Sequence, residues 1–276
     1  MRTSSLLTHP APRPWVPILL YHRVVPRRPA SDPRGLTITT RTFESHLRWL
    51  SYHGYRSVSL QQVGSLLGPH APVNTLRPHD LDDPRRLVAI TFDGGYYDNL
   101  AHAFPLLVTY GFTATIFVVA GAVGGVNDFD RHTRGYEEAR MLSADGTRSL
   151  HRYGIDIGAH SVSLVDLSMA QLEHELMWSK LILEDIVDAP VRHFSYPHSR
   201  SDARIEAAVA ENGYRLACAG VGTRFTRYCL HRVAASPRGG LDMEARIKWR
   251  RLKWSIRSRA PLHPSENPLE MRGLGG

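Results

Sequence analysis

Short apolar runs rich in β-branched residues alternate along the chain with segments of helical period. Between two of these runs, Phe43, Leu47 and Leu50 form a helical stripe, with Thr40 as a possible N-cap and Gly54 just past the end. Such alternation is typical of βα units built around a parallel sheet. Seven runs predict strands, at residues 16–21, 56–59, 87–92, 113–119, 155–158, 193–196 and 215–219.

Two longer helices are predicted further along the chain. The first covers about 171–187, where Ser168 followed by Gln171 has the spacing of a capping box. The second covers 202–212 and ends at Gly213. Together with the strands, these helices fit a chain of 276 residues that folds as one α/β domain.

The two ends of the chain differ from this middle part. Residues 1–15 and 259–276 have no periodic apolar pattern, so they are predicted to be disordered. The α/β domain is therefore placed at 16–240, and a helix at 241–258 follows it. No apolar run approaches the ~20 residues of a membrane-spanning helix, and no signal peptide is recognised. A cytoplasmic or membrane-surface location is expected.

Positive charge is concentrated in the segment 245–260. It holds seven lysines and arginines and no acid, while the whole chain has a net charge of +8. Trp249, Leu252 and Ile256 form a stripe along it, as in a helix that lies on an anionic membrane surface. The alternative is that the stripe docks on the domain. No nucleic-acid partner is expected.

Four polar residues follow predicted strands at the point where each strand ends. His22, Asp93, His160 and His198 come directly after, or one residue after, strands that end at 21, 92, 158 and 196. In parallel βα architectures these carboxyl ends share one edge of the sheet, where active sites form. The sequence therefore predicts that these four residues share one cleft.

Several ordered segments give the chain a resemblance to a known family. They include ILLYHRV at 18–24, TFDGGYYDN at 91–99, IGAHSVSLVDLS at 157–168 and RHFSYPHSR at 192–200. In order and spacing they resemble the polysaccharide deacetylase family. The resemblance implies a distorted (β/α) barrel of about seven strands, of the NodB-homology type. It also implies metal-assisted hydrolysis of acetyl groups on a carbohydrate, usually with zinc or another divalent ion.

The resemblance assigns roles to residues, and two of the metal ligands are missing. Asp93 matches the general base, and His160 matches a metal ligand. Gly94 and Leu164 stand where the family has its other two ligands, and neither side chain has a donor atom. His22 is a further candidate ligand because it lies at the same edge. We therefore expect little bound metal, and we expect Gly94→Asp with Leu164→His to raise zinc affinity by orders of magnitude.

The remaining roles come from the third and last motifs of the family. Substrate binding is assigned by resemblance to Tyr96, Arg192, Tyr196 and Pro197. His198 supplies the backbone N–H of the oxyanion site, or an acid/base side chain. The nearest counterpart of the late general-acid histidine is His231, at a different spacing.

Three functions from different classes stay open at this stage. The chain can be an active carbohydrate hydrolase with a rebuilt metal site, a catalytically inactive protein that binds a glycan or a partner, or a metal-free enzyme. Structural roles also stay open: His160 can be a core histidine, and Asp98 and Asn99 can cap a helix that begins near 99. The loop residues Asp128, Asp130 and His132 can be solvated or can turn into the cleft. Only the positions of these side chains in space distinguish the alternatives.

Overall fold

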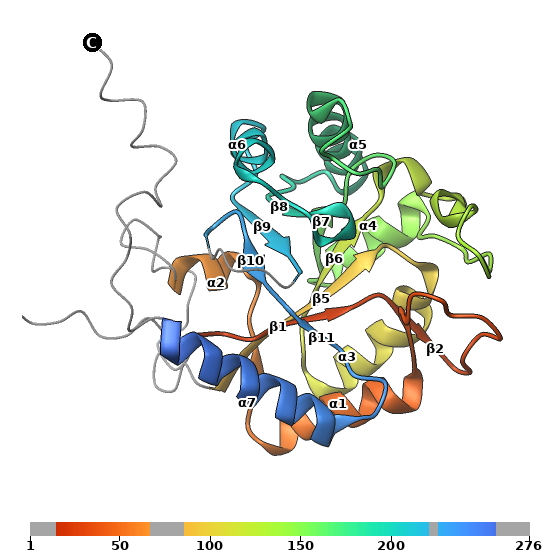
Figure 1. Ribbon diagram of the computed structural model, residues 1–276. Coiled ribbons are helices and arrows are strands. Elements are labelled where there is room, and N and C mark those ends of the chain that lie inside the picture. The colour runs from red at the N-terminus through yellow and green to blue at the C-terminus, as the bar shows by residue number, and fades with distance from the viewer. Residues whose placement is uncertain (1–14, 67–85, 221–225, 258–276) are drawn as a thin grey trace, which may run out of the picture.

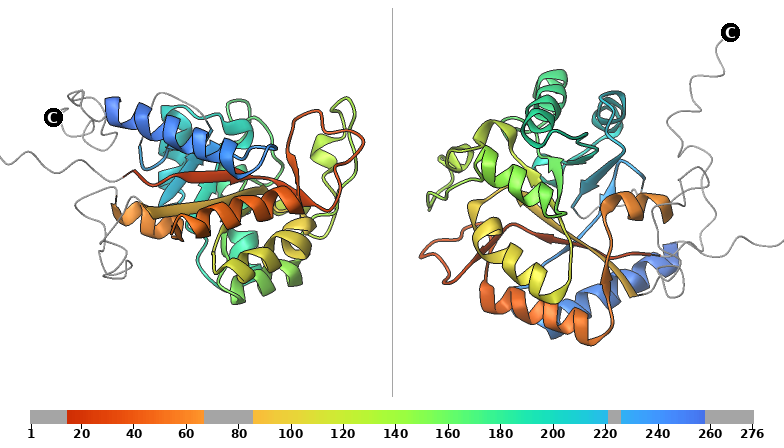
Figure 2. Two further views of the ribbon diagram at one scale, coloured as in Figure 1. Left: turned by 90° about the horizontal axis from the view of Figure 1, so that it is seen from below. Right: turned by 180° about the vertical axis from the view of Figure 1, so that it is seen from behind.

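The computed structural model describes residues 15–66, 86–220 and 226–257 of the chain (Figure 1). Parallel strands form its centre, and the helices lie around them (Figures 1 and 2). All seven predicted strands are present, and every pairing in the main sheet is parallel. They are β1 (Ile18–Tyr21), β4 (Arg56–Ser57), β5 (Leu87–Gly94), β6 (Thr115–Val118), β7 (Asp156–Ala159), β8 (His193–Ser195) and β9 (Leu216–Ala219).

The sheet comes almost full circle because one stretch of chain supplies both of its ends. The strand order is β10-β9-β8-β7-β6-β5-β1-β11, with β4 paired to β5. Strand β10 (Leu230–His231) pairs with β9, and β11 (Val233–Ala234) pairs with β1. Only Arg232 separates these two short strands. The architecture is therefore a distorted (β/α) barrel, as predicted, that closes at Arg232.

The helices cover the outside of the barrel (Figure 2). Two π-helical segments, η4 (Asn99–Ala103) and η7 (His174–Trp178), lead directly into α3 and α5. A separate two-stranded sheet, β2 (Arg23–Val25) with β3 (Thr37–Thr39), follows β1. The helices on the barrel are α1 (Thr40–Tyr52), α2 (Leu60–Leu66), α3 (Phe104–Tyr110), α4 (Ala144–Arg152), α5 (Ser179–Val187) and α6 (Ala203–Glu211).

Two predicted helix caps differ from the structure. Thr39, not Thr40, caps α1, because its hydroxyl accepts a hydrogen bond from the Thr42 N–H at 3.1 Å. Ser168 does not cap the helix near 171; its hydroxyl instead donates to Asp166 at 2.8 Å. In both cases the predicted cap lies one or a few residues from the actual start of the helix. Sequence spacing alone does not fix a helix end more closely than that.

The last helix, α7 (Gly240–Arg257), contains most of the basic segment. It packs on α1 (Figure 1), and Met243 and Ile247 are buried among its side chains up to residue 252. Trp249 and Leu252, two members of the predicted stripe, are 57% and 52% exposed. The docking face is thus a different one from that stripe. In the part of the chain that is described, no helix is both long and apolar enough to cross a membrane.

Both predicted disordered ends fall almost entirely outside the described residues, which begin at 15 and end at 257. Cys218 and Cys229 are buried, and no disulfide joins them. Cys218 lies in an apolar cluster with Phe117 and Leu216, which are also buried. The two cysteines therefore serve as small apolar core residues.

Candidate active site

A pocket of about 240 Å³ opens at the carboxyl edge of the strands. Because β1, β5, β7 and β8 are parallel, the residues that end them meet there. The four polar residues predicted to share a cleft all line this pocket, together with neighbours from the loops around it. The lining residues are His22, Arg34, Leu36, Asp93, Gly94, Tyr96, Phe129, Asp130, His160, Leu164, Tyr196, His198 and Ser199.

Asp93 lies at the bottom of the pocket in a buried ion pair with Arg232. The Arg232 Nη1 is 2.6 Å from Asp93 Oδ1, and Nη2 is 2.7 Å from Oδ2, so the pair is bidentate. The Arg232 side chain is fully buried. Burial by itself raises the pKa of Asp93, but the bidentate Arg232 guanidinium outweighs burial and holds that pKa well below its usual range. Asp93 is therefore a carboxylate throughout the neutral range.

Two hydroxyl groups complete the polar network around this ion pair. The Ser195 hydroxyl donates to Asp93 Oδ2 at 3.0 Å and accepts from Arg232 Nη2 at 2.9 Å. Arg232 Nη1 also lies 3.3 Å from the Thr91 hydroxyl, and its Nε lies 3.3 Å from the Ala219 carbonyl. Both carboxylate oxygens thus already accept hydrogen bonds from the protein. This makes Asp93 a fixed negative charge more than a mobile proton acceptor.

His160 presents one ring nitrogen to the pocket. Its Nδ1 lies 2.7 Å from the Ser195 carbonyl oxygen, which can only accept, so Nδ1 carries the hydrogen. In the neutral ring Nε2 then has a free lone pair, and it lies 3.9 Å from Asp93 Oδ2. Burial lowers the pKa of His160, and the attraction of Asp93 offsets only part of that effect. The expected state is a neutral imidazole whose Nε2 faces the carboxylate.

His22 also lines the pocket, close enough to Asp93 to feel its charge. Burial lowers the pKa of His22 to about 4, against an opposing attraction from Asp93. Its backbone carbonyl accepts from Asn99 Nδ2 at 2.8 Å. Asp98 accepts from the Val24 N–H and from Arg23 Nε, both at 3.0 Å. Asp98 and Asn99 therefore hold the chain after β1 in place and do not cap the helix with their side chains.

The two positions at which the family resemblance places further metal ligands are filled by the fold itself. Gly94 has a φ of 108°, and a Cβ there would lie 2.5 Å from Cε2 of Tyr96. The Tyr96 ring thus takes the space where a side chain at position 94 would begin. Leu164 packs against an apolar cluster that contains Val119 and Met141. Over the described residues, no three His, Cys, Asp or Glu side chains are grouped so as to hold a metal ion.

The third motif folds as a short turn beside the pocket. His198 is exposed, has a φ of 55°, and its Nε2 lies 3.1 Å from the Leu164 carbonyl oxygen. Tyr196 is buried and its hydroxyl donates to the Tyr228 carbonyl at 2.8 Å. Pro197 is buried between them. This turn therefore joins the loops after β7 and β8 at the pocket.

The structure does not bring two of the predicted site residues to this pocket. Arg192 precedes β8, at the end of that strand opposite the pocket, and its carbonyl accepts from the Arg215 N–H at 2.7 Å. His231 lies in β10, and its Nδ1 is 2.9 Å from the Gly220 carbonyl oxygen. The residue that reaches Asp93 is the next one, Arg232, which sequence reasoning missed. A lone arginine inside the apolar run at 229–235 was the available signal, since a buried charge requires a partner.

The sequence model of the family described as polysaccharide deacetylase matches residues 80–217, half of the chain. The chain belongs to the polysaccharide deacetylase family. YxkH of Bacillus subtilis (strain 168), named as a polysaccharide deacetylase, is 28% identical over 229 residues, which are 80% of this chain and 72% of YxkH. The poly-β-1,6-N-acetyl-D-glucosamine N-deacetylase of Escherichia coli (strain K12) is 26% identical over 113 residues, 41% of this chain and 15% of that protein.

Solved structures agree with this assignment at the level of the fold. The structure of IcaB from Ammonifex degensii superposes with a TM-score of 0.66 at 23% identity, covering 83% of this chain and 95% of that one. Relatives of the chain are thus deacetylases of polysaccharides, a class of carbohydrate hydrolases. The family generally depends on a metal ion. The residues of this pocket do not fit that requirement, because Gly94 and Leu164 offer no donor atom and the Tyr96 ring fills the adjoining space.

Proposed function

We propose that this protein removes acetyl groups from a polysaccharide without a bound metal ion, and that it cleaves O-acetyl esters in preference to acetamido groups. Membership of the family and the relative that acts on poly-β-1,6-N-acetyl-D-glucosamine support the substrate class. The observation that carries the metal-free chemistry is the pairing of a free His160 Nε2 with the Asp93 carboxylate at 3.9 Å, beside ligand positions that cannot bind metal.

The nucleophile is a water molecule held between the two groups. With a separation of 3.9 Å, one water can lie within about 2.8 Å of both His160 Nε2 and Asp93 Oδ2. Its oxygen attacks the acetyl carbonyl carbon while Nε2 takes its proton. The Asp93 carboxylate stabilises the resulting imidazolium. Asp93 itself is the weaker base, because its pKa lies far below neutral.

Collapse of the tetrahedral intermediate completes the reaction. The bond between the carbonyl carbon and the sugar oxygen breaks, and the imidazolium returns its proton to that oxygen, so the products are a free hydroxyl and acetic acid, which releases the second water proton to solvent and leaves as acetate. The donor to the developing oxyanion is the backbone N–H of His198, whose left-handed conformation is fixed by the contact of its ring with the Leu164 carbonyl. One such donor contributes about 3–4 kcal/mol to transition-state stabilisation.

The preference for esters follows from the absence of a Lewis acid. An ester carbonyl is less stabilised by resonance than an amide carbonyl, and a sugar alkoxide leaves far more easily than an amide nitrogen. A metal ion contributes several kcal/mol to carbonyl polarisation. Without that contribution, the imidazole and one N–H suffice for the easier substrate only.

The test compares acetate release from O-acetylated and N-acetylated oligosaccharides by protein dialysed against a chelator. We expect ester hydrolysis that the chelator does not change, and a loss of roughly 10²–10⁴-fold in His160→Ala. His174→Ala, at an exposed histidine on η7, is the matched control and should leave the rate unchanged. Deacetylation of the N-acetylated substrate that requires added zinc would contradict the proposal.

A second function, sugar binding without turnover, is favoured by one observation. Both oxygens of Asp93 already accept hydrogen bonds from Arg232 and Ser195, which restricts its part in chemistry. If this function is correct, the wild type and His160→Ala bind the acetylated oligosaccharide alike, and neither releases acetate.

We also propose that α7 contacts an anionic membrane surface, which would place the protein at a membrane. Trp249 and Leu252 lie exposed among the lysines and arginines of this helix. Deleting the helix would also remove the buried Met243 and Ile247, so charge reversal is the cleaner test. Lys248→Glu with Arg250→Glu should weaken binding to phosphatidylserine vesicles, and the difference should shrink at high salt. Equal binding at low salt would contradict this proposal.

A further inference from the structure

We propose that a second groove beside the pocket binds the next sugar residue of the polysaccharide, and that the Phe129 ring is the wall between the two sites. This inference rests on the proposed function, because the pocket itself must take a sugar residue. The groove has a volume of about 480 Å³. It is lined by the chain after β6, the loop at 128–132 and the chain after β7.

The same two loops build both the pocket and the groove. The loop at 128–132 contributes Asp130 to the pocket and Asp128 and Arg131 to the groove. The chain after β7 contributes Leu164 to the pocket and residues 162–163 to the groove. Phe129 lines both. A polymer that leaves the pocket past Phe129 therefore enters the groove directly.

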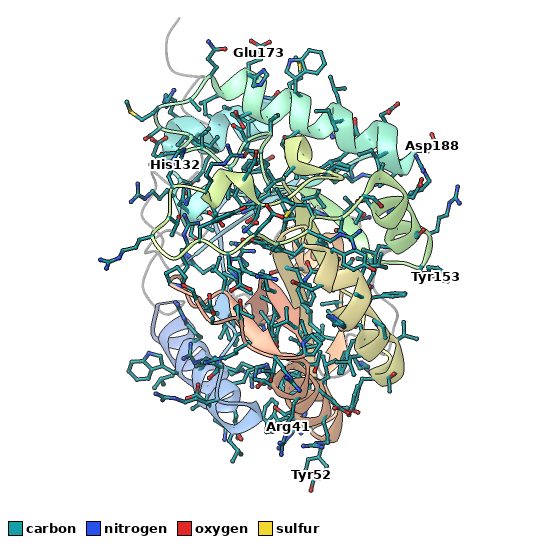
Figure 3. All side chains as sticks on the ribbon, turned by 90° about the vertical axis from the view of Figure 1, so that its right-hand side faces the viewer. Arg41, Tyr52, His132, Tyr153, Glu173 and Asp188 are labelled. Carbon is teal, nitrogen blue, oxygen red and sulfur yellow. The ribbon has the colours of Figure 1, made fainter. Side chains whose placement is uncertain are left out.

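The two volumes match a polymer better than a small molecule. At about 240 Å³ the pocket is smaller than the roughly 300–1,000 Å³ typical of sites for drug-sized ligands, so it suits one sugar residue. A polysaccharide must continue beyond that residue, and the adjoining groove of about 480 Å³ provides space for it. The loop that carries Phe129 projects from the barrel at this edge, where His132 is visible in Figure 3.

The floor of the groove is rigid before any ligand binds. The Gly121 N–H donates to the Val162 carbonyl at 2.9 Å, and a Cβ on Gly121 would lie 2.7 Å from that oxygen. From beneath, the buried Glu175 carboxylate accepts from the N–H groups of Val162 and Ser163 at 2.9 and 3.0 Å. A preformed floor lowers the entropy that binding costs.

The chemistry of the groove suits a neutral sugar. Phe129 is partly buried and offers a ring on which the apolar C–H face of a sugar can pack. At the rim, Asp128 and Arg131 form an exposed pair at 3.4 Å, so acceptors and donors for hydroxyl groups are present without an excess of either charge. An anionic sugar would gain little from such a balanced rim.

Binding of N-acetylglucosamine and of its β-1,6-linked tetramer to the full-length protein tests this inference by calorimetry. The acetamido group resists turnover in the proposed mechanism, so binding can be measured on the wild type. We expect the tetramer to bind at least tenfold more tightly than the monomer. Phe129→Ala should remove most of that advantage by weakening tetramer binding far more than monomer binding, and Phe129→Leu, which keeps apolar volume without a ring, should give an intermediate loss.

Two further variants make the test specific to the groove. Gly121→Ala should weaken tetramer binding alone, because the new methyl group displaces the floor. Tyr153→Ala removes another aromatic ring, 75% exposed on the far side of the molecule from His132 in Figure 3, and should change neither affinity. Circular dichroism melting curves confirm that each variant is folded.

The outcomes separate this inference from the function on which it rests. Equal wild-type affinities for monomer and tetramer, or a Phe129→Ala change that weakens both equally, would overturn the second site. Acetate release that depends on His160 would still support the proposed function in that case. If neither sugar binds and no acetate is released, both proposals fail.

Discussion

The two sides of the pocket differ in how far they follow the family pattern. On one side, Asp93 keeps its place and is held by Arg232 and Ser195 in a fully bonded network. On the other side, Gly94 and Leu164 stand where the family resemblance places metal ligands, and an aromatic ring and an apolar cluster occupy the space. The comparison teaches that the charged side is built into a buried hydrogen-bonded network of the fold, whereas the other side is apolar.

The largest expected effect comes from breaking the charged side at Arg232. Arg232→Met leaves the buried Asp93 without its partner, which should lower the free energy of unfolding by about 3–5 kcal/mol. Urea denaturation at pH 7 measures this loss. Arg246→Met, which removes an exposed ion pair with Asp242, is the control and should cost far less stability. A loss at Arg232 as small as in the control would contradict a structural role for the charged side.

The second prediction concerns the apolar side. From the sequence alone, Gly94→Asp with Leu164→His is expected to raise zinc affinity by orders of magnitude. The structure revises this expectation: the double variant should regain little zinc affinity, because the new side chain at 94 meets the Tyr96 ring. Adding Tyr96→Ala should raise zinc affinity by about 100-fold, equivalent to about 2.7 kcal/mol. Isothermal titration of apo-protein with zinc measures the difference, with Tyr96→Ala alone as the control. Equal zinc affinity of the double and triple variants would show that the ring is no obstacle.

A smaller effect is expected from Ser195→Ala, which separates the structural role of the side that holds Asp93 from its role in the proposed chemistry. Ser195→Ala removes a hydroxyl that bonds to Asp93 but keeps the carbonyl that orients His160. Stability should fall by about 1.5–3 kcal/mol, as for a hydrogen bond to a charged group. Ester hydrolysis should stay within a few-fold of wild type once folding is ensured. A collapse in the rate constant of the folded variant would instead place the hydroxyl in the chemistry.

The smallest effect is a dependence of stability on pH that involves His22. Burial lowers the pKa of His22 to about 4, so between about pH 6.5 and 4 the unfolded chain binds a proton that the folded chain does not. The contribution of His22 is therefore fully present above pH 6.5 and is lost as pH falls through 4. Between pH 7 and 5 it should amount to about 1 kcal/mol, after allowance for its partial exposure.

Denaturation curves of the wild type and His22→Gln at pH 7 and pH 5 isolate this contribution. The variant should lose less stability than the wild type on acidification. His46 also has a pKa lowered to about 4 by burial, so part of the pH dependence will persist in the variant. An identical pH dependence in both proteins would show that His22 does not change its protonation on folding.

Much of the fold could be predicted from the sequence because it depends on periodic patterns. All seven predicted strands exist, and most of them are apolar runs whose burial on both faces suits a parallel sheet; β4, with the partly buried Arg56 and Ser57, is the exception. The short strands β10 and β11 were missed, because two residues each are too few for a pattern. Arg232 was missed with them. The family motif indicates His231, whereas the role of Arg232 depends on how the barrel closes, which the sequence pattern does not show.

The candidate site could be predicted only in part, for a different physical reason. Strand ends give the position of Asp93 and His160 along the chain, and parallel pairing then brings them together. The orientation of the Tyr96 ring, the tautomer of His160 and the volume beside Phe129 depend on side-chain packing among loops, which no periodicity records. For loop residues such as Asp130, the sequence therefore does not distinguish a solvated position from one in the cleft. In the structure Asp130 lines the pocket and pairs with Arg34.

Closure of the barrel by a single residue also has a consequence for the order of folding. Asp93 and Arg232 are 139 positions apart in the sequence, and β11 can pair with β1 only after nearly all of the barrel has been synthesised. Until then the buried carboxylate has no cation to compensate it, and the two edges of the sheet are open. A growing chain that ends before Arg232 is thus held short of the closed state. We therefore expect the ion pair and the pairing of β11 with β1 to form late in folding, because both join segments that are far apart in the sequence.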